Sequence, residues 1–396
     1  MTPADLFAPL TLPCGAVLRN RLVKSAMSDS LGDGQGDPGP VQARLYERWA
    51  EGGVAASIIG EVQGDPFAAE KPGNLVLHDG SDGGKLGALT NRATQDGAHL
   101  WAQLGHAGAM AHPPISRPRG PSALNLPGLA CEALSLSDIA ALPTAFARTA
   151  ARAVSAGFTG VQIHAAHGFL LSQFLSPLFN KRGDAYGGTL TNRMRLLMDV
   201  VSAVREAVGP DLPVALKLNA TDQLQGGFAE TEALEVIGAL SGSGLDLIDI
   251  SGGTYFPGAP SASDRTTPAP YFLAFAAVAR QRTDVPLMIT GGIKTKADAA
   301  QALAGGAVDA VGLARSLIID PALPRTWRRG GNDPAFPRFS NPPEGGITAW
   351  YTMRLTALAE DNDAAAPLSM EEAVAAYDAR DERRVSLWQQ RFGGPD

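Results

Sequence analysis

One arrangement of apolar and polar positions recurs along the chain: a short apolar run, then a longer segment with apolar residues three and four apart. Short apolar runs are typical of buried strands, and the longer spacing is typical of amphipathic helices. Eight strands are predicted in this way, at Leu22–Ala26, Val54–Gly60, His99–Leu104, Gly160–His164, Val214–Leu218, Leu247–Ile250, Leu287–Thr290 and Ala310–Leu313. Eight successive βα units favour a parallel sheet and fit an α/β barrel.

Three of the intervening segments have the clearest helical pattern. They are Ser137–Ala156, Arg193–Val208 and Thr231–Leu240. Ser and Asp are residues that commonly cap helices, so Ser137 and Asp138 are predicted to start the first of the three.

Stretches rich in Pro and Gly interrupt the repeat in two places. One lies between residues 105 and 130 and predicts a long irregular excursion after the third strand. The other, Gly330–Gly346, is predicted to be a linker to a C-terminal arm. The arm has a helical pattern around Ala349–Ala359 and Met370–Arg380. The loops at 105–130 and 253–268 and the arm are expected to shape a pocket.

The chain is therefore predicted to have two parts. Residues 1–328 form the barrel, and residues 329–396 form the linker and a helical extension. The extension is expected to pack either on the barrel or on a neighbouring subunit of a homo-oligomer.

Composition narrows the classes of partner. A chain of 396 residues with 45% hydrophobic content can bury a large core. Its net charge of −7 offers no basic face, so nucleic acid and membrane are not expected as partners, and a small-molecule substrate is. Cys14 and Cys131 are too few for a disulfide scaffold or an iron–sulfur cluster. Without a signal-like start or a run of about 18 apolar residues, a soluble, cytoplasmic protein is expected.

The densest candidate chemistry follows the fourth predicted strand. His164 and His167 lie at its carboxyl end, where ligands bind in parallel α/β sheets. Two imidazoles at this spacing could ligate a metal, orient a carbonyl group or be satisfied polar groups of the core. No Cys or carboxylate is spaced in sequence to complete a metal site. An oxygen atom of an organic ligand is favoured, because imidazole N–H groups are good donors to it.

Two glycine-containing segments lie at the seventh and eighth strands. They are residues 289–293, Ile-Thr-Gly-Gly-Ile, and residues 311–315, Val-Gly-Leu-Ala-Arg. Phosphate groups often bind at this place in α/β barrels, where backbone N–H groups point outward. Glycine lets the backbone approach a ligand closely, and Arg315 can add a charge-assisted hydrogen bond. The two segments together predict a phosphate site.

Residues 160–193 resemble the Old Yellow Enzyme family. The likeness rests on His-Ala-Ala-His-Gly-Phe-Leu at 164–170, Phe-Leu-Ser-Pro-Leu at 174–178, Asn180, Arg182, Asp184, Tyr186-Gly187-Gly188 and Asn192-Arg193. Further segments extend it over roughly residues 5–320. The resemblance implies a (β/α)8 TIM barrel that binds FMN and takes hydride from NADH or NADPH. It also implies hydride transfer to the β-carbon of an activated alkene, an α,β-unsaturated carbonyl or nitro compound.

The resemblance implies roles for individual residues. His164 and His167 match the pair that holds the substrate oxygen, and Gln103 matches an amide at the flavin ring. Lys217 matches a basic residue beside the N1 and C2=O edge of the flavin, although a salt bridge to a barrel carboxylate would also explain a buried lysine. The remaining cofactor contacts are expected from Ser25, Ala26, Met27, Ser28, Gly291, Gly292, Ala314 and Arg315.

One position departs from the family pattern. Phe169 stands in the substrate pocket where many members carry a Tyr that protonates the α-carbon. In one hypothesis the protein still reduces alkenes, with a proton from water or from Tyr255. In a second, the oxidant is a quinone or nitro group that needs no carbon protonation. In a third, the protein desaturates a carbonyl compound and oxygen reoxidises the flavin.

Two readings of another class stay open. A barrel of this composition could bind flavin without turnover, as a sensor or scaffold. An unrelated aldolase or isomerase would use Lys217 as nucleophile or base.

Overall fold

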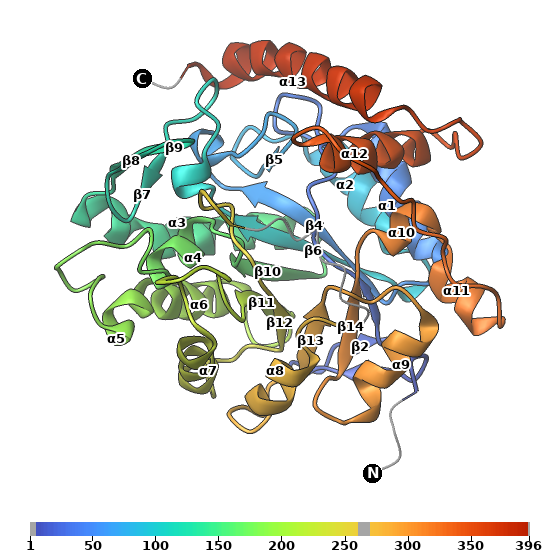
Figure 1. Cartoon of the computed structure of the whole chain (residues 1–396), viewed down its shortest axis with the longest axis horizontal. Helices are drawn as coiled ribbons and strands as arrows, with labels where there is room; N and C mark the ends of the chain where they lie inside the picture. The colour runs from blue at the N-terminus through green and yellow to red at the C-terminus, as the bar shows by residue number, and fades with distance from the viewer. Residues whose placement is uncertain (1–4, 260–269, 395–396) are drawn as a thin grey trace.

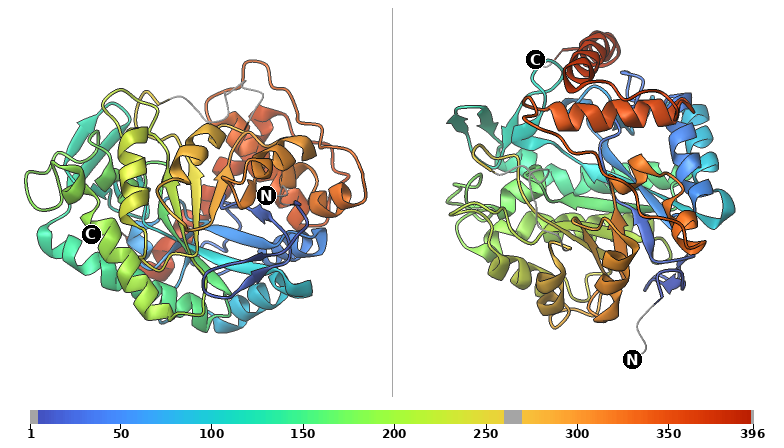
Figure 2. Two further views of the ribbon diagram at one scale, coloured as in Figure 1. Left: turned by 90° about the horizontal axis from the view of Figure 1, so that it is seen from below. Right: turned by 45° about the vertical axis from the view of Figure 1, so that its right-hand side comes forward.

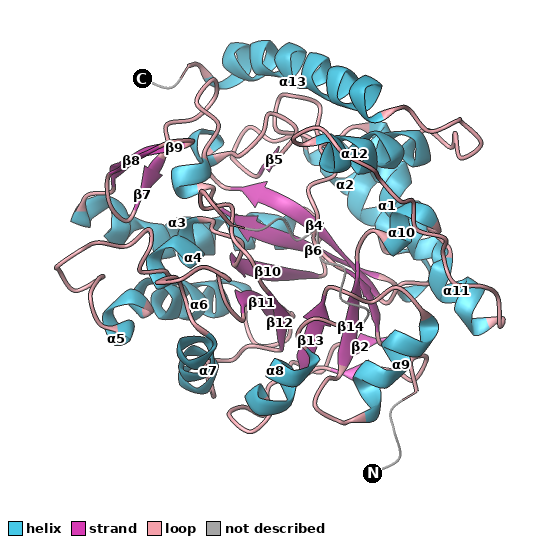
Figure 3. Ribbon diagram, in the orientation of Figure 1, coloured by secondary structure: helices cyan, strands magenta, loops and turns pink. Residues whose placement is uncertain are grey.

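A computed structural model gives the structure of the chain and describes residues 5–259 and 270–394. Eight parallel strands close into a barrel, because the last one, β14, pairs with β3 and β3 pairs in turn with β4. Helices surround the barrel (Figures 1 and 3). The fold is the (β/α)8 TIM barrel that the sequence pattern predicts. The barrel strands are β3 (Leu22–Lys24), β4 (Ala56–Gln63), β6 (His99–Gly105), β10 (Gly160–Ala165), β11 (Val214–Asn219), β12 (Leu247–Ser251), β13 (Leu287–Thr290) and β14 (Ala310–Leu313).

The bounds of the first two barrel strands differ from the prediction. β3 stops at Lys24, two residues early, although Ser25 still donates its N–H to the carbonyl oxygen of Leu313 at 2.8 Å. β4 begins at Ala56 and continues to Gln63, where it also pairs with β5 (Leu75–Val76). Polar residues end this strand, so the pattern of apolar residues stops before the strand does.

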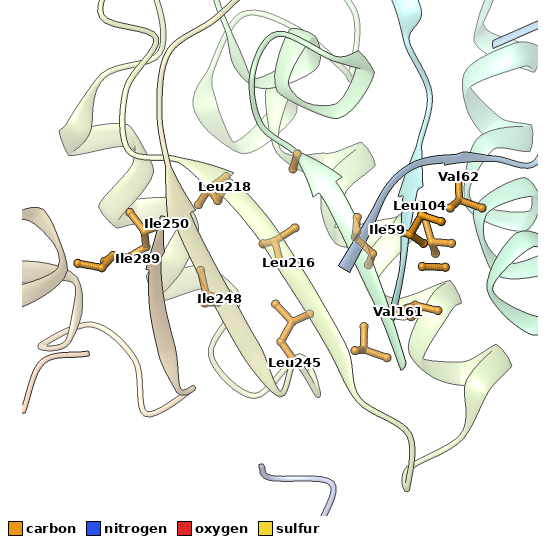
Figure 4. Packing of buried hydrophobic residues seen from close by; sticks show 14 of the residues in the cluster. Ile59, Val62, Leu104, Val161, Leu216, Leu218, Leu245, Ile248, Ile250 and Ile289 are labelled. Carbon is orange, nitrogen blue, oxygen red and sulfur yellow. The ribbon is translucent and has the colours of Figure 1, made fainter. Parts of the chain in front are cut away.

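Alternation along each strand divides the side chains between two cores. Outward residues such as Ile59, Val161, Leu216 and Ile248 pack beneath the helices (Figure 4). Inward residues near the amino ends of the strands are apolar. They form a second cluster with the antiparallel pair β1 (Leu10–Thr11) and β2 (Val17–Leu18), which includes Leu10, Leu12, Leu18, Val23, Ile58, Trp101, Leu247 and Met288. The amino end of the barrel is therefore closed by apolar packing.

The helices occupy the predicted places with small differences in their ends. The first clear pattern forms α3 (Leu136–Ser155), but the cap is Ser135, whose hydroxyl accepts from the N–H of Asp138, and not Ser137. The reason is spacing, because a capping box needs an acidic residue three positions after the cap. The others are α1 (Pro40–Gly52), α2 (Gly83–Ala93), α4 (Leu170–Leu175), α5 (Leu190–Arg193), α6 (Arg195–Val208), α7 (Glu230–Ala239), α8 (Leu273–Ala279), α9 (Lys296–Ala304), α10 (Ser316–Ile319), α11 (Leu323–Arg328), α12 (Gly346–Ala359) and α13 (Met370–Phe392), with 3₁₀ turns at η1 (Pro66–Ala68), η2 (Gln95–Gly97) and η3 (Gly108–Met110).

The excursion after β6 contains a small sheet of its own. It is built from β7 (Arg119–Gly120), β8 (Leu124–Leu126) and β9 (Leu129–Ala133), with β9 in the middle. Of the second expected loop, residues 253–268, the part from residue 260 onward lies outside the described residues.

The C-terminal arm lies against the barrel of its own chain. Helix α13 is longer than predicted and runs to Phe392, side by side with α12 (Figures 1 and 2). Trp388 is fully buried in a cluster with Val76 and Ile115, and the guanidinium of Arg384 donates to the carbonyl oxygen of Ser30 at 2.6 Å. Within the described residues, no helix is long and apolar enough to cross a membrane.

Candidate active site

A cavity of about 580 Å³ lies at the carboxyl ends of the barrel strands. Its lining comes from the strand ends and from the arm. The strand ends are those of β4, β6 and β10, together with the segment that follows β3, and the arm contributes residues of α12 and α13. Its lining includes Ala26, Met27, Ser28, Glu61, Glu70, Gln103, His164, His167, Phe169, Tyr255, Arg315, Tyr351 and Tyr377. The strand ends therefore bring together most of the residues that the sequence marks as candidates.

A layer of hydrogen-bonded polar side chains crosses the barrel near the same ends of the strands. The amide of Gln103 donates to Gln162 at 2.8 Å, and the amide of Gln162 donates to Asp249 at 3.3 Å. On the other side, the hydroxyl of Thr290 donates to Asp249 at 2.7 Å and lies 2.8 Å from that of Ser25. Inward positions change from apolar to polar at this level, and each of these five side chains makes at least one hydrogen bond to another.

Lys217 and Asp249 are the charged pair of this layer. The ammonium nitrogen lies 2.6 Å from the carboxylate, and the two side chains are 1% and 0% exposed. One interpretation of the sequence was that Lys217 forms a salt bridge to a barrel carboxylate, and Asp249 is that carboxylate. Contact of Lys217 with a flavin stays a prediction, and Asp249 itself was not identified from the sequence.

The imidazole of His164 presents an N–H group to the cavity. Its Nδ1 accepts from the backbone N–H of Ala166 at 3.3 Å, so in the neutral ring the proton is on Nε2. Burial, and then the charge of Lys217, lowers the pKa of His164 to about 3. The ring is therefore neutral at physiological pH and acts as a hydrogen-bond donor without net charge.

The second imidazole is held from two sides. The backbone N–H of His167 donates to Asn219 at 3.1 Å, and its Nε2 lies 2.9 Å from the hydroxyl of Ser251. Its φ of 60° is unusual for a residue other than glycine, and such strain concentrates at functional sites. The rings of His164 and His167 are 5.3 Å apart, and burial holds the pKa of His167 well below its usual value. Two neutral imidazoles thus lie next to each other in the cavity.

A carboxylate that the sequence analysis missed lies beside this pair. Oε1 of Glu61 is 3.3 Å from Nε2 of His164, and its side chain is 5% exposed. Because the imidazole is neutral, Glu61 gains no cationic partner there, and burial raises its pKa to about 7. Its position in the sequence could have identified Glu61 as a site residue, because it follows an apolar run as the other strand-end candidates do.

Phe169 and Tyr255 lie in contact beside the histidines. The ring of Phe169 is 5.0 Å from that of His164 and 5.8 Å from that of Tyr255. Phe169 is buried, whereas Tyr255 is 65% exposed. The backbone N–H of Tyr255 donates to the carbonyl oxygen of His167 at 3.2 Å, which fixes its place in the chain.

A second cavity of about 530 Å³ adjoins the first and shares His167, Tyr255 and Arg315 with it. Gly291 and Gly292, also in its lining, have φ values of 127° and 78°. In the described parts of the chain Arg315 forms no ion pair, and its guanidinium lies 5.6 Å from the ring of Tyr351. An uncompensated cation next to two glycines with positive φ, whose backbone a ligand can approach closely, suits an anionic group.

Three sequence candidates, Ser25, Lys217 and Ala314, are not among the residues that line the two cavities. Ser25 and Lys217 are buried in the polar layer, and Ala314 is half-buried just after β14. The segment that contains Ser25 packs closely against β14 at Gly312. A Cβ at Gly312 would lie 2.3 Å from the Ser25 hydroxyl oxygen, so this packing requires glycine. No group of three or more metal-ligating side chains occurs in the residues that the structure describes.

Fold and site together define an α/β barrel whose strand ends hold a pair of neutral imidazoles in one cavity and an arginine beside two glycines in the next. The profile of the NADH:flavin oxidoreductase / NADH oxidase family matches residues 5–333. The chain belongs to this family, the Old Yellow Enzyme family. Its cofactor is FMN, and NADH or NADPH is the reductant.

Individual relatives agree with this assignment. The chain is 34% identical to the NADH-dependent flavin oxidoreductase iliE of Hypocrea jecorina (strain QM6a), over 82% of this chain and 89% of that one. It is 32% identical to an NADPH dehydrogenase of Bacillus licheniformis, over 82% and 94%. Morphinone reductase has a similar structure, with a TM-score of 0.73 at 26% identity over 85% and 92%. Some relatives are longer, and the chain covers 47% of two of them.

Proposed function

We propose that the protein transfers hydride from reduced FMN to the β-carbon of an activated alkene, an α,β-unsaturated carbonyl or nitro compound. The observation that carries this proposal is the pair of neutral imidazoles in the cavity. Two N–H donors directed at one oxygen atom would draw electron density from the conjugated β-carbon and make it a hydride acceptor. A neutral imidazole keeps one N–H group, so each ring can donate a hydrogen bond without carrying a charge.

The residues present fit FMN. We propose that Arg315 and the backbone of Gly291 and Gly292 hold the phosphate, and that Gln103 and Lys217 face the ring. The further contacts would come from the segment Ser25 to Ser28 and from Ala314. Bound FMN would supply the two-electron hydride chemistry. The side chains of the polar layer are held in place by their hydrogen bonds to one another.

A second candidate function is favoured by Phe169. This residue has no proton to give, which suits an oxidant such as a quinone or nitro group that needs no protonation at carbon. The same feature suits desaturation with oxygen as the final acceptor. Tyr255 remains the proton donor proposed from the sequence if alkenes are reduced.

An anaerobic titration tests the proposal. NADH or NADPH should bleach the FMN-loaded protein, and 2-cyclohexenone should restore the absorbance. His164→Ala and His167→Ala should slow the restoring step by about 10²–10³-fold. His99→Ala is the matched control, because His99 begins β6 at the opposite end of the barrel. Bleaching that only a quinone reverses would overturn the alkene proposal in favour of the second candidate.

A further inference from the structure

Glu61 is held in the cavity by an irregularity of β4. The pairing of β4 with β6 passes from Ile59 opposite Ala102 to Val62 opposite Leu104, so two residues of β4 oppose one of β6. Glu61 is one of those two, and its φ is 59°. β-Bulges re-aim side chains and occur often beside active sites, and a left-handed φ is strained at a residue other than glycine. The fold thus tolerates strain at the residue that places a carboxyl group beside His164.

The neighbours of Glu61 fit a carboxyl group and little else. A Cβ at Gly105 would lie 2.6 Å from its Oε2, so the absence of a side chain there makes the room. The amide of Gln63 donates to the same oxygen at 3.3 Å, and its own oxygen has no partner among the described residues. A half-turn of that amide would present an acceptor to a protonated carboxyl. Gln63 can therefore serve Glu61 in both protonation states.

We propose that the carboxyl group of Glu61 is the proton donor to the α-carbon of the alkene. The inference rests on the proposed alkene reduction and names the group that supplies what Phe169 lacks. Glu61 adjoins the N–H of His164 that would hold the substrate oxygen, so a bound enone would place its α-carbon, two bonds from that oxygen, near the carboxyl. Tyr255 also lines the cavity, with its ring 5.8 Å from that of Phe169, and is the alternative donor that the experiment compares with Glu61.

The step balances in atoms and electrons. The β-carbon receives a hydride with its electron pair from the reduced cofactor, and the alkene π pair moves toward the α-carbon and the carbonyl. That pair takes the proton of Glu61, forming the bond to hydrogen at the α-carbon and leaving the O–H pair on the carboxylate. Solvent then returns a proton to Glu61. Desaturation would run the same proton transfer in reverse.

Burial raises the pKa of Glu61 to about 7, against the hydrogen bond from Gln63, which lowers it. The titratable and polar groups that face Glu61 are His164 from β10, Gln63 from its own strand and Glu70 from the segment after η1. Glu70 in turn faces Lys71 and Asp381 of α13. Burial, then the charge of Glu61, raises the pKa of Glu70 to about 8. A general acid works best when its pKa lies near the pH at which the enzyme operates. A carboxyl with a raised pKa still carries its proton in part near pH 7.

The test compares two oxidants in Glu61→Gln and Glu132→Gln. Gln keeps the shape of Glu but has no acidic proton. The ratio of the rates at which 2-cyclohexenone and benzoquinone reoxidise the bleached protein should fall by about 10²–10⁴-fold in Glu61→Gln. Glu132 lies on β9 and lines neither cavity, so Glu132→Gln, the control, should leave the ratio close to that of the native chain. Glu61→Asp should recover part of the ratio.

A readout without substrate comes from infrared difference spectra of the oxidised protein between about pH 6 and pH 9. The carbonyl band of a protonated carboxyl should disappear as pH rises, and Glu61→Gln should remove the component that titrates near pH 7.

An unchanged ratio in Glu61→Gln, with a loss in Tyr255→Phe, would overturn the inference and assign the proton to Tyr255. An equal loss with both oxidants would also overturn it, since Glu61 would then only position His164. A native protein that reacts with benzoquinone but not with the enone would instead refute the proposed function.

Discussion

The buried pair Lys217 and Asp249 allows a quantitative prediction about what holds the cofactor end of the barrel together. Asp249→Asn keeps the shape and the hydrogen bond from Thr290 but removes the carboxylate charge that lies 2.6 Å from the ammonium group. The pair is at most 1% exposed, so water cannot replace the lost carboxylate. Breaking one partner of such a pair costs about 3–5 kcal/mol, and we expect Asp249→Asn to lower the free energy of unfolding by that amount.

A double-variant cycle separates the ion pair from other effects of the substitution. Lys217→Met leaves Asp249 buried without a counter-charge and should also destabilise the protein. The variant with both substitutions has no buried charge and should be less destabilised than either single variant. Glu132→Gln is the control for loss of an exposed pair: Glu132 and Arg117 are 59% and 54% exposed, and it should cost less than about 1 kcal/mol.

Urea unfolding at fixed excess FMN, followed by tryptophan fluorescence, measures the free energy of unfolding of the native protein and of each variant. Additive effects of the two single substitutions in the double variant would refute the reasoning.

Three further predictions concern other parts of the molecule. Phe169→Tyr should have a small effect in the native chain but should restore enone reduction at least about tenfold in Glu61→Gln, and stopped-flow rates without any such rescue would show that a hydroxyl at residue 169 does not reach the α-carbon. Burial lowers the pKa of Lys24 to about 7, so the native state lacks a proton that the unfolded state keeps between there and about pH 10.4. Lys24→Met should therefore gain most in urea stability at and below pH 7, and the gain should shrink steadily as the pH rises toward about 10.4; a gain independent of pH would contradict this. Trp388→Ala should remove about 3–5 kcal/mol of packing from the arm, seen as faster hydrogen exchange in α13 than in the barrel strands, and equal exchange in both would count against independent packing of the arm.

The apolar pattern was sufficient for the barrel because it repeats. Each βα unit carries the same signal, so an error in one strand end does not change the architecture. The bounds were less certain where a strand leaves the apolar pattern: β4 continues through Glu61, which lines the cavity, and Gln63, which is buried and donates a hydrogen bond to Glu61. The misplaced cap of α3 has a different cause, because three neighbouring polar residues all suit a helix start and only Ser135 has the acidic partner at the right spacing.

Some residues of the candidate site could be predicted from the sequence and others could not. His164 and His167 were predicted because they share one segment, and the glycines near Arg315 were predicted because they follow strands. Glu61 and Asp249 come from other strands, and their partners are set by barrel closure and register, which places Lys217 opposite both His164 and Asp249. A single sequence carries no direct signal of such pairing. Polar residues at strand ends deserve to be treated as one set in a parallel barrel, whatever their separation along the chain.

The central claim is hydride transfer to the β-carbon of an activated alkene, and product analysis tests it most directly. FMN-loaded protein is incubated anaerobically with 2-cyclohexenone and with NADH that carries deuterium at the transferred position, and the products are analysed by mass spectrometry and NMR. The account predicts cyclohexanone with deuterium at the β-carbon and solvent hydrogen at the α-carbon. Oxidation of NADH with benzoquinone but no cyclohexanone under any condition would contradict it.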